Sequence, residues 1–133
     1  MMNKIFLAIK TDNPITEIYL IHRESEIAKE VWESGNKLSL QILDKLEELL
    51  TRSGHKKSEM GGIVVFEGPG SFTGLRIGTS VANALAYSYQ IPIVGTSGNN
   101  WIQDGLLKLR KAKISIYVSP KYGRDPHVTK PKK

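Results

Sequence analysis

The stretch that most constrains this chain runs from Gly68 to Gly78 and follows directly on the apolar run Ile63–Phe66. It reads Gly68-Pro69-Gly70-Ser71-Phe72-Thr73-Gly74-Leu75-Arg76-Ile77-Gly78. An apolar run followed by Gly-Pro-Gly predicts a buried strand and a tight turn, because Gly68 and Gly70 can take positive φ around the fixed φ of proline. Ser71 or Thr73 is expected to cap the amides of the helix that follows. The stretch therefore predicts a strand, a turn and the start of a helix.

The amides of this turn form a candidate anion site, together with the positive end of the helix dipole. The contributing residues would be Gly68, Gly70, Ser71, Thr73 and Arg76. The pattern matches neither G-x-G-x-x-G nor G-x-x-x-x-G-K-[ST], and it contains no lysine that would reach a phosphate. A purely structural turn is an equally good interpretation. One alternative function is a small nucleotide-binding enzyme domain that uses the Gly68–Gly74 turn.

The same stretch resembles the signature of the TsaB family, bacterial proteins needed to place threonylcarbamoyl on the adenosine beside the anticodon of certain tRNAs. Leu7-Ala8-Ile9 with Thr11 is similar to the family's first strand, and Ile91–Ser97 is similar to the segment after its second helix. The resemblance implies an α/β fold of the actin-like ATPase, ribonuclease-H-like kind, with a mixed β-sheet and flanking helices. It also implies a non-catalytic subunit that supports the catalytic paralogue TsaD, with TsaE as a further partner and tRNA contacted indirectly.

Length and composition suit one such domain. The chain has 133 residues, 40% of them hydrophobic, which is enough for one packed core but not for a second full lobe. We expect a domain over residues 1–118 and a basic tail over 119–133, and we interpret the chain as a naturally minimal form of the family. An engineered or degenerate fragment is the alternative. The absence of cysteine excludes disulfides and thiolate metal sites, and with no long apolar run it predicts a cytoplasmic protein without membrane contact.

Charge is unevenly distributed along the chain. Residues 1–107 carry ten Lys or Arg and twelve Asp or Glu, whereas residues 108–133 carry nine and one. The net charges of the two parts are therefore −2 and +8. An RNA-binding adaptor that uses the basic C-terminus is a second alternative function. The preferred interpretation is a solvated tail, because only Tyr117 and Tyr122 offer aromatic platforms among these charges.

Three strands are expected before the first helix, over Lys4–Lys10, Ile15–Arg23 and Glu26–Trp32, as a hairpin meander. In actin-like ATPases an aspartate near the end of the first strand handles metal and phosphate, and TsaB proteins usually show Asp-Thr there. This chain has Lys10-Thr11, and a lysine cannot ligate Mg²⁺. We therefore expect no cofactor for this subunit alone, with ATP bound only at or through the partner complex. Alternatively, Lys10 simply lies at an exposed strand end.

The first predicted helix spans about sixteen residues between the cap residues Ser34-Gly35-Asn36 and Gly54, a natural residue to follow a helix. Its apolar residues form a broad face, with Leu40 off the main stripe. These residues are Leu38, Leu40, Ile42, Leu43, Leu46, Leu49 and Leu50. The face is expected to cover the sheet, while Leu40 could serve a second contact.

The second predicted helix, about Thr73–Tyr89, carries Gly74, Gly78 and Ala82 at i, i+4 and i+8. Such a line of small residues lets another helix approach closely. The resemblance implies that the two helices form the interface of both the homodimer and the TsaD complex, and a homodimer is expected without the partner. The expected interface residues are Leu38, Ile42, Leu46, Gly74, Gly78, Ala82 and Leu85. Burial within one domain is the alternative.

The rest of the chain predicts a strand at Ile91–Val94, a helix at Asn99–Lys113 and a last strand at Ile114–Val118. The histidines are scattered, with no H-x-x-x-H and no carboxylate at ligand spacing. These residues are His22, His55 and His127. No metal site and no catalytic residue is therefore predicted, and each histidine is interpreted as a surface or structural residue.

Overall fold

The computed structural model describes residues 4–111. Its elements are β1 (Ile5–Lys10), β2 (Ile15–His22), β3 (Ser25–Glu33), α1 (Leu38–Ser53), β4 (Met60–Phe66), α2 (Phe72–Tyr89), β5 (Ile93–Thr96) and α3 (Trp101–Lys111), with single 3₁₀ turns at Gly35–Lys37 and Lys57–Glu59. Every element expected in this part of the chain is present, with ends that differ by a few residues. The expected strand Ile114–Val118 and the tail 119–133 lie outside the described residues.

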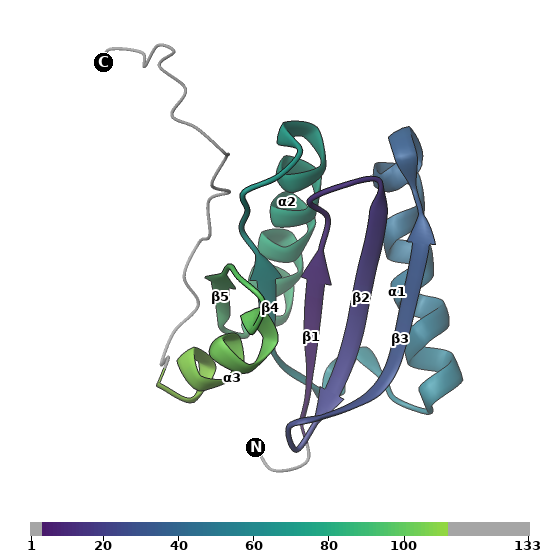
Figure 1. The fold of residues 1–133 in the computed structure, drawn as a ribbon. Helices are drawn as coiled ribbons and strands as arrows, with labels where there is room; N and C mark the ends of the chain where they lie inside the picture. The colour runs from purple at the N-terminus through teal and green to yellow at the C-terminus, as the bar shows by residue number, and fades with distance from the viewer. Residues whose placement is uncertain (1–3, 112–133) are drawn as a thin grey trace.

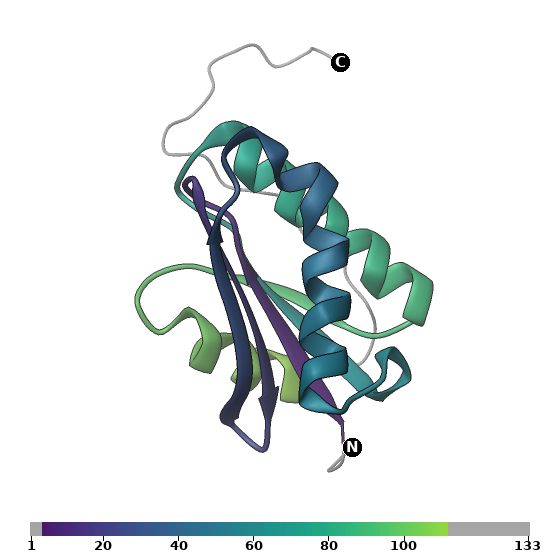
Figure 2. The same ribbon diagram turned by 90° about the vertical axis from the view of Figure 1, so that its right-hand side faces the viewer.

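The strands form one mixed sheet in the order β3-β2-β1-β4-β5. β1, β4 and β5 run parallel, while β2 pairs antiparallel with both β1 and β3. The hairpin meander and the mixed sheet are thus confirmed. Figure 1 shows α1 and α2 behind the sheet and α3 in front of it, and Figure 2 shows the same layers nearly edge-on. No helix among residues 4–111 combines the length and the apolar character needed to cross a bilayer.

The core has two layers because successive side chains of a strand point to opposite faces of the sheet. In β1, Ile5, Leu7 and Ile9 face α1 and α2, whereas Phe6 and Ala8 face α3. On the α3 face, Trp101 packs edge-on against other aromatic rings, with ring centroids 5.7 Å from Phe66 and 6.2 Å from Tyr19. The alternation of side-chain direction continues past the end of β1. Consecutive residues of the following turn therefore also point toward different layers of the core.

The helix ends agree only partly with the predicted caps. Gly54 takes the left-handed conformation after α1, with φ at 79°, and Ser71 caps α2 by accepting a hydrogen bond from the Gly74 N–H at 3.3 Å. The predicted cap at the start of α1 is wrong, because Lys37 precedes the helix and makes no side-chain cap bond. Ser34 instead places its hydroxyl 2.8 Å from that of Thr16, a buried contact that joins this loop to β2.

The broad apolar face of α1 is narrower than expected. Leu38, Ile42 and Leu46 are buried, as are the two leucines of the last turns, but Leu40 and Leu43 are 78% and 51% exposed. The reason is the packing of α1 on β3. Gln41 accepts a hydrogen bond from the Trp32 indole at 3.0 Å, and the Lys45 ammonium lies 5.5 Å from the Trp32 ring centroid. That contact fixes one flank of α1 on the strand and turns the opposite flank, with Leu40 and Leu43, away from β3.

Candidate functional site

The Gly68–Ser71 turn follows β4 and packs directly on the turn between β1 and β2. The Ser71 N–H donates to the Asp12 carbonyl at 2.7 Å. A Cβ added to Gly70 would lie 2.5 Å from the Asp12 Cβ, so no larger residue fits there. Gly68 has the predicted positive φ, at 117°, but Gly70 does not. Glycine is thus required at position 70 because the backbone there lies close to Asp12, and not because of a positive φ.

The residues of the candidate anion site come together at the start of α2, but several of the amides there already have partners. The Ser71 N–H binds Asp12, the Gly74 N–H binds the Ser71 hydroxyl, and the Leu75 N–H binds the Ser71 carbonyl. Thr73 and Arg76 are exposed, and the Arg76 guanidinium lies 5.4 Å from the ring centroid of Phe72. Anion binding at this turn therefore stays a prediction, with fewer unused donors than the sequence suggested.

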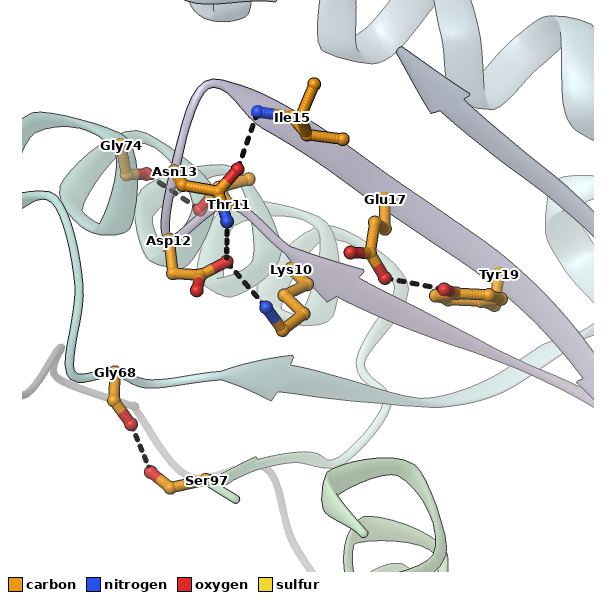
Figure 3. A network of polar contacts seen from close by, with 10 residues as sticks. All are labelled: Lys10, Thr11, Asp12, Asn13, Ile15, Glu17, Tyr19, Gly68, Gly74 and Ser97. Atoms are coloured by element: carbon orange, nitrogen blue, oxygen red, sulfur yellow. Dashed lines mark hydrogen bonds and ion pairs between the residues drawn. The ribbon is translucent and has the colours of Figure 1, made fainter. Parts of the chain in front are cut away.

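Lys10 lies against an acidic side chain that the sequence reasoning overlooked. Its ammonium donates to the Asp12 carboxylate at 2.7 Å, and the two side chains are only 18% and 16% exposed (Figure 3). The same ammonium lies 4.5 Å from the ring centroid of Phe66 on the α3 face. An acid therefore does lie beside Thr11, although the sequence analysis considered only the lysine there. That carboxylate is, however, neutralised by the lysine that replaces the family's usual aspartate, and Lys10 is not a free strand end.

Thr11 points to the opposite face and meets α2. It is 1% exposed, and its hydroxyl donates to the Gly74 carbonyl at 2.7 Å (Figure 3). A Cβ added to Gly78 would lie 2.1 Å from the Thr11 hydroxyl oxygen, and one added to Gly74 would lie 2.3 Å from the Thr11 carbonyl oxygen. Ala82, next in the line, is fully buried in the core. The glycines of the small-residue line therefore admit the end of β1, and the expectation that this line also belongs to a partner interface stays a prediction.

The other predicted interface residues also contribute to the core of the domain. Leu38, Ile42 and Leu46 are 3%, 2% and 4% exposed, and Leu85 is partly buried against the same cluster. Whether the helix pair binds a partner stays a prediction. The large apolar side chains that this pair exposes are different ones, namely Leu40 and Leu43 on α1 and Phe72 and Tyr87 on α2. The helical period of the apolar residues could not distinguish the side chains that face the sheet from these exposed ones.

On α2, the partly buried apolar residues Ile77, Val81 and Leu85 recur at i, i+4 and i+8 and pack against the core cluster that includes the buried residues of α1. They therefore lie against the layer of the core that α1 and α2 cover. We call Leu40 and Leu43 together with these three residues the helix-pair flank.

Two further contacts of the described region were not predicted. The Tyr19 hydroxyl donates to the Glu17 carboxylate at 2.5 Å (Figure 3), and burial, followed by this hydrogen bond, raises the pKa of Tyr19 above its ordinary value. Tyr19 thus stays protonated and structural. His22 and His55, interpreted as scattered, lie with their ring centroids 6.4 Å apart. No group of three or more His, Cys, Asp or Glu within residues 4–111 is arranged to hold a metal ion.

A five-stranded mixed sheet in this order, with helices on both faces, defines an α/β domain of the actin-like, ribonuclease-H-like class. The family model described as "TsaD: tRNA N6-adenosine threonylcarbamoyltransferase" matches residues 33–119. The tRNA threonylcarbamoyladenosine biosynthesis protein TsaB of Bacillus subtilis is 35% identical over 91 residues, which are 68% of this chain and 40% of that protein. The TsaB protein of Haemophilus influenzae is 27% identical over 85% of this chain and 48% of its own length.

Among solved structures, YeaZ from Pseudomonas aeruginosa superposes with a TM-score of 0.66 at 26% sequence identity, over 71% of this chain and 44% of that one. The chain belongs to the TsaB family, within the wider group that the TsaD family model describes. It spans about half the length of the curated relatives that it matches.

Proposed function

We propose that this chain is a non-catalytic subunit that binds a TsaD homologue through the helix-pair flank. In that complex it supports threonylcarbamoylation of the adenosine next to the anticodon in tRNA. The observation that carries the proposal is the pair of exposed leucines, Leu40 and Leu43, beside a helix pair of a TsaB-family domain. The names of the curated relatives assign those proteins to biosynthesis of threonylcarbamoyladenosine in tRNA.

The energetics of the flank support a partner. Covering one exposed leucine side chain contributes about 1.5–3 kcal/mol at most, and each 1.4 kcal/mol corresponds to about a tenfold change in affinity. Leu40 and Leu43 are 78% and 51% exposed, so most of this gain is unused in the isolated chain. The same flank would serve a homodimer when TsaD is absent, in which case the two assemblies compete for one surface.

The first test is association. Leu43→Glu should abolish co-purification with the TsaD homologue from the same cell and reduce tRNA modification in a reconstituted assay, because it places a charge within the apolar flank. Leu107→Glu is a matched control. Leu107 is 53% exposed, close to the 51% of Leu43, but it lies on α3, on the other face of the sheet. If both variants fold and both bind TsaD normally, the helix pair is not the interface and the proposal is wrong.

A second part of the proposal concerns nucleotides. We propose that the subunit alone does not bind Mg-ATP tightly and does not hydrolyse it, so that any ATP is bound at or through the partner complex. Two features support this: the Lys10–Asp12 pair occupies the end of β1, and Gly70 packs on Asp12 without space for a Cβ. A lysine ammonium repels a hard cation and competes with it for the Asp12 carboxylate. Calorimetry that shows micromolar Mg-ATP binding, lost in Gly70→Val, would contradict this part.

RNA contact by the basic C-terminus remains a weaker candidate. Of the basic residues at the end of α3, Lys108 donates to the Gly95 carbonyl at 2.8 Å, and Arg110 forms an ion pair with Glu24. Both are therefore partly engaged within the domain. Deleting residues 121–133 should lower tRNA affinity of the assembled complex at low salt if the tail contacts RNA, and should leave the salt dependence unchanged if it does not.

A further inference from the structure

Two histidines that are far apart in sequence lie close together at the end of the sheet where β2 ends. His22 is the last residue of β2, and His55 follows the last turn of α1, so the whole of β3 and α1 lies between them in the chain. Their ring centroids are 6.4 Å apart and their planes are inclined by 50°. His55 has a side-chain exposure of 25%, and His22 is likewise partly buried. The two imidazoles are therefore held close but remain open to solvent.

The orientation of His55 is fixed by a carboxylate. The Nδ1 atom of His55 lies 3.0 Å from the Glu59 carboxylate, which also accepts the Lys56 backbone N–H at 2.7 Å. These two contacts hold the Glu59 carboxylate in place beside the imidazole. A carboxylate on one ring nitrogen is the usual support of a metal-binding histidine, and it leaves Nε2 available.

The surrounding charge also suits a cation. The backbone N–H of His55 donates to the Leu50 carbonyl at 3.0 Å, so His55 lies at the C-terminal end of α1, where the helix dipole is negative. The negative end of the helix dipole and the Glu59 carboxylate together offset the positive charge of the nearby Lys56, which is exposed.

We propose that His22 and His55 form a two-histidine site for a divalent transition-metal ion of the kind that imidazole prefers, with zinc as the first choice. The ion would join the end of β2 to the segment after α1. An ion bound at about 2.0–2.1 Å from one nitrogen of each ring keeps the ring centres roughly 5 to 6 Å apart, so a movement of about 1 Å closes the site. Since no set of three such side chains is arranged within residues 4–111, water or a partner's ligand completes the coordination.

The test is calorimetry with ZnCl₂ on the full chain, prepared without a polyhistidine tag. One ion should bind per chain at pH 7.5. MgCl₂ should give no heat of binding. His22→Gln and His55→Gln should each weaken zinc binding at least tenfold. His127→Gln, which changes the third histidine of the sequence, should have no effect.

Glu59→Gln separates the metal site from a simple pair of surface histidines. It keeps both rings but removes the charge behind His55, and loss of such a support typically lowers metal affinity by about 10 to 100-fold. Circular dichroism confirms that each variant is folded. The proposal is overturned if folded His22→Gln or His55→Gln binds zinc as the original chain does, if His127→Gln removes binding, or if the unaltered chain does not bind zinc.

Discussion

Helix α2 carries two contrasting rows of residues, one of small residues and one of larger apolar residues. In the row of small residues, Gly74 and Gly78 bring the helix against Thr11, at distances where an added Cβ on either glycine would overlap an oxygen atom. In the second row, Ile77, Val81 and Leu85 are only partly buried, and on α1 Leu43 is 51% exposed. The small residues therefore mark the closest contact within the domain, whereas part of the surface of the larger apolar residues remains exposed.

This difference changes which residues should be altered to separate folding from association. Interiors are close-packed, so bulk added in the row of small residues has no space and must displace the strand end. Bulk or charge added at the exposed residues of the helix-pair flank, Leu40 and Leu43, meets solvent in the isolated chain and matters mainly when a partner covers it. The predictions below test this contrast, beginning with the largest expected effect on stability.

Gly78→Leu should prevent stable folding rather than only block a partner. A Cβ at this position would lie 2.1 Å from the Thr11 hydroxyl oxygen, and the rest of the leucine would need still more space. We expect a loss of about 3 kcal/mol or more in the free energy of unfolding, at the upper end of the range for overpacking. Urea denaturation followed by circular dichroism measures it. A folded Gly78→Leu variant of normal stability that fails to bind TsaD would instead favour the small-residue line as the partner surface.

Gly78→Ala should cost about 1–3 kcal/mol, and Thr11→Ala should relieve part of that cost, because the closest atom is the hydroxyl oxygen of the threonine side chain. Gly74→Ala is the matched control. Its added Cβ would lie 2.3 Å from the Thr11 backbone carbonyl, which Thr11→Ala leaves in place. A double-mutant cycle should thus give a favourable coupling of roughly 1 kcal/mol for Gly78 and little for Gly74. Equal couplings at the two positions would contradict the geometry described above.

Ser71→Ala should lower the free energy of unfolding by about 1 kcal/mol, because the Gly74 N–H would lose its side-chain cap. Ser80→Ala is the control, since Ser80 is exposed in the middle of α2. That change should alter stability by less than about 0.5 kcal/mol. Thermal or urea unfolding compares the two. If they cost the same, the cap does not contribute to the stability of the turn.

Leu43→Ala should have the smallest effect on the isolated chain, within about 0.5 kcal/mol of unfolding free energy, because half of the side chain already faces solvent. Leu107→Ala should be equally mild in the same denaturation experiment. The two should differ in TsaD affinity, where Leu43→Ala is expected to cost about tenfold if Leu43 is an anchor of the interface. A large loss of stability in Leu43→Ala would mean that the flank is part of the core.

Several local features of this fold were predictable from the sequence alone. The apolar run before Gly68 predicted β4, Ser71 predicted the cap of α2, and Gly54 predicted the end of α1. These succeed because strand period, helix period and capping depend on residues only a few positions apart. The signature from Gly68 to Gly78 also indicated the family, which the comparisons confirm.

Other features depended on which distant segments the sheet order brings together. Placing β4 beside β1 put Asp12 against Gly70, and alternation past β1 sent Lys10 toward Phe66 and Thr11 toward α2. No local pattern contains these pairs.

The orientation of α1 was decided in the same way, because its contact with Trp32 on β3 left Leu43 exposed although the helical period placed it on the apolar face. The sequence by itself thus determined the elements, their caps and the family. Only the tertiary structure decided which side of each helix is core and which is surface. That choice depends on contacts between segments that lie far apart in the sequence, and the local periodicity of the sequence does not indicate such contacts.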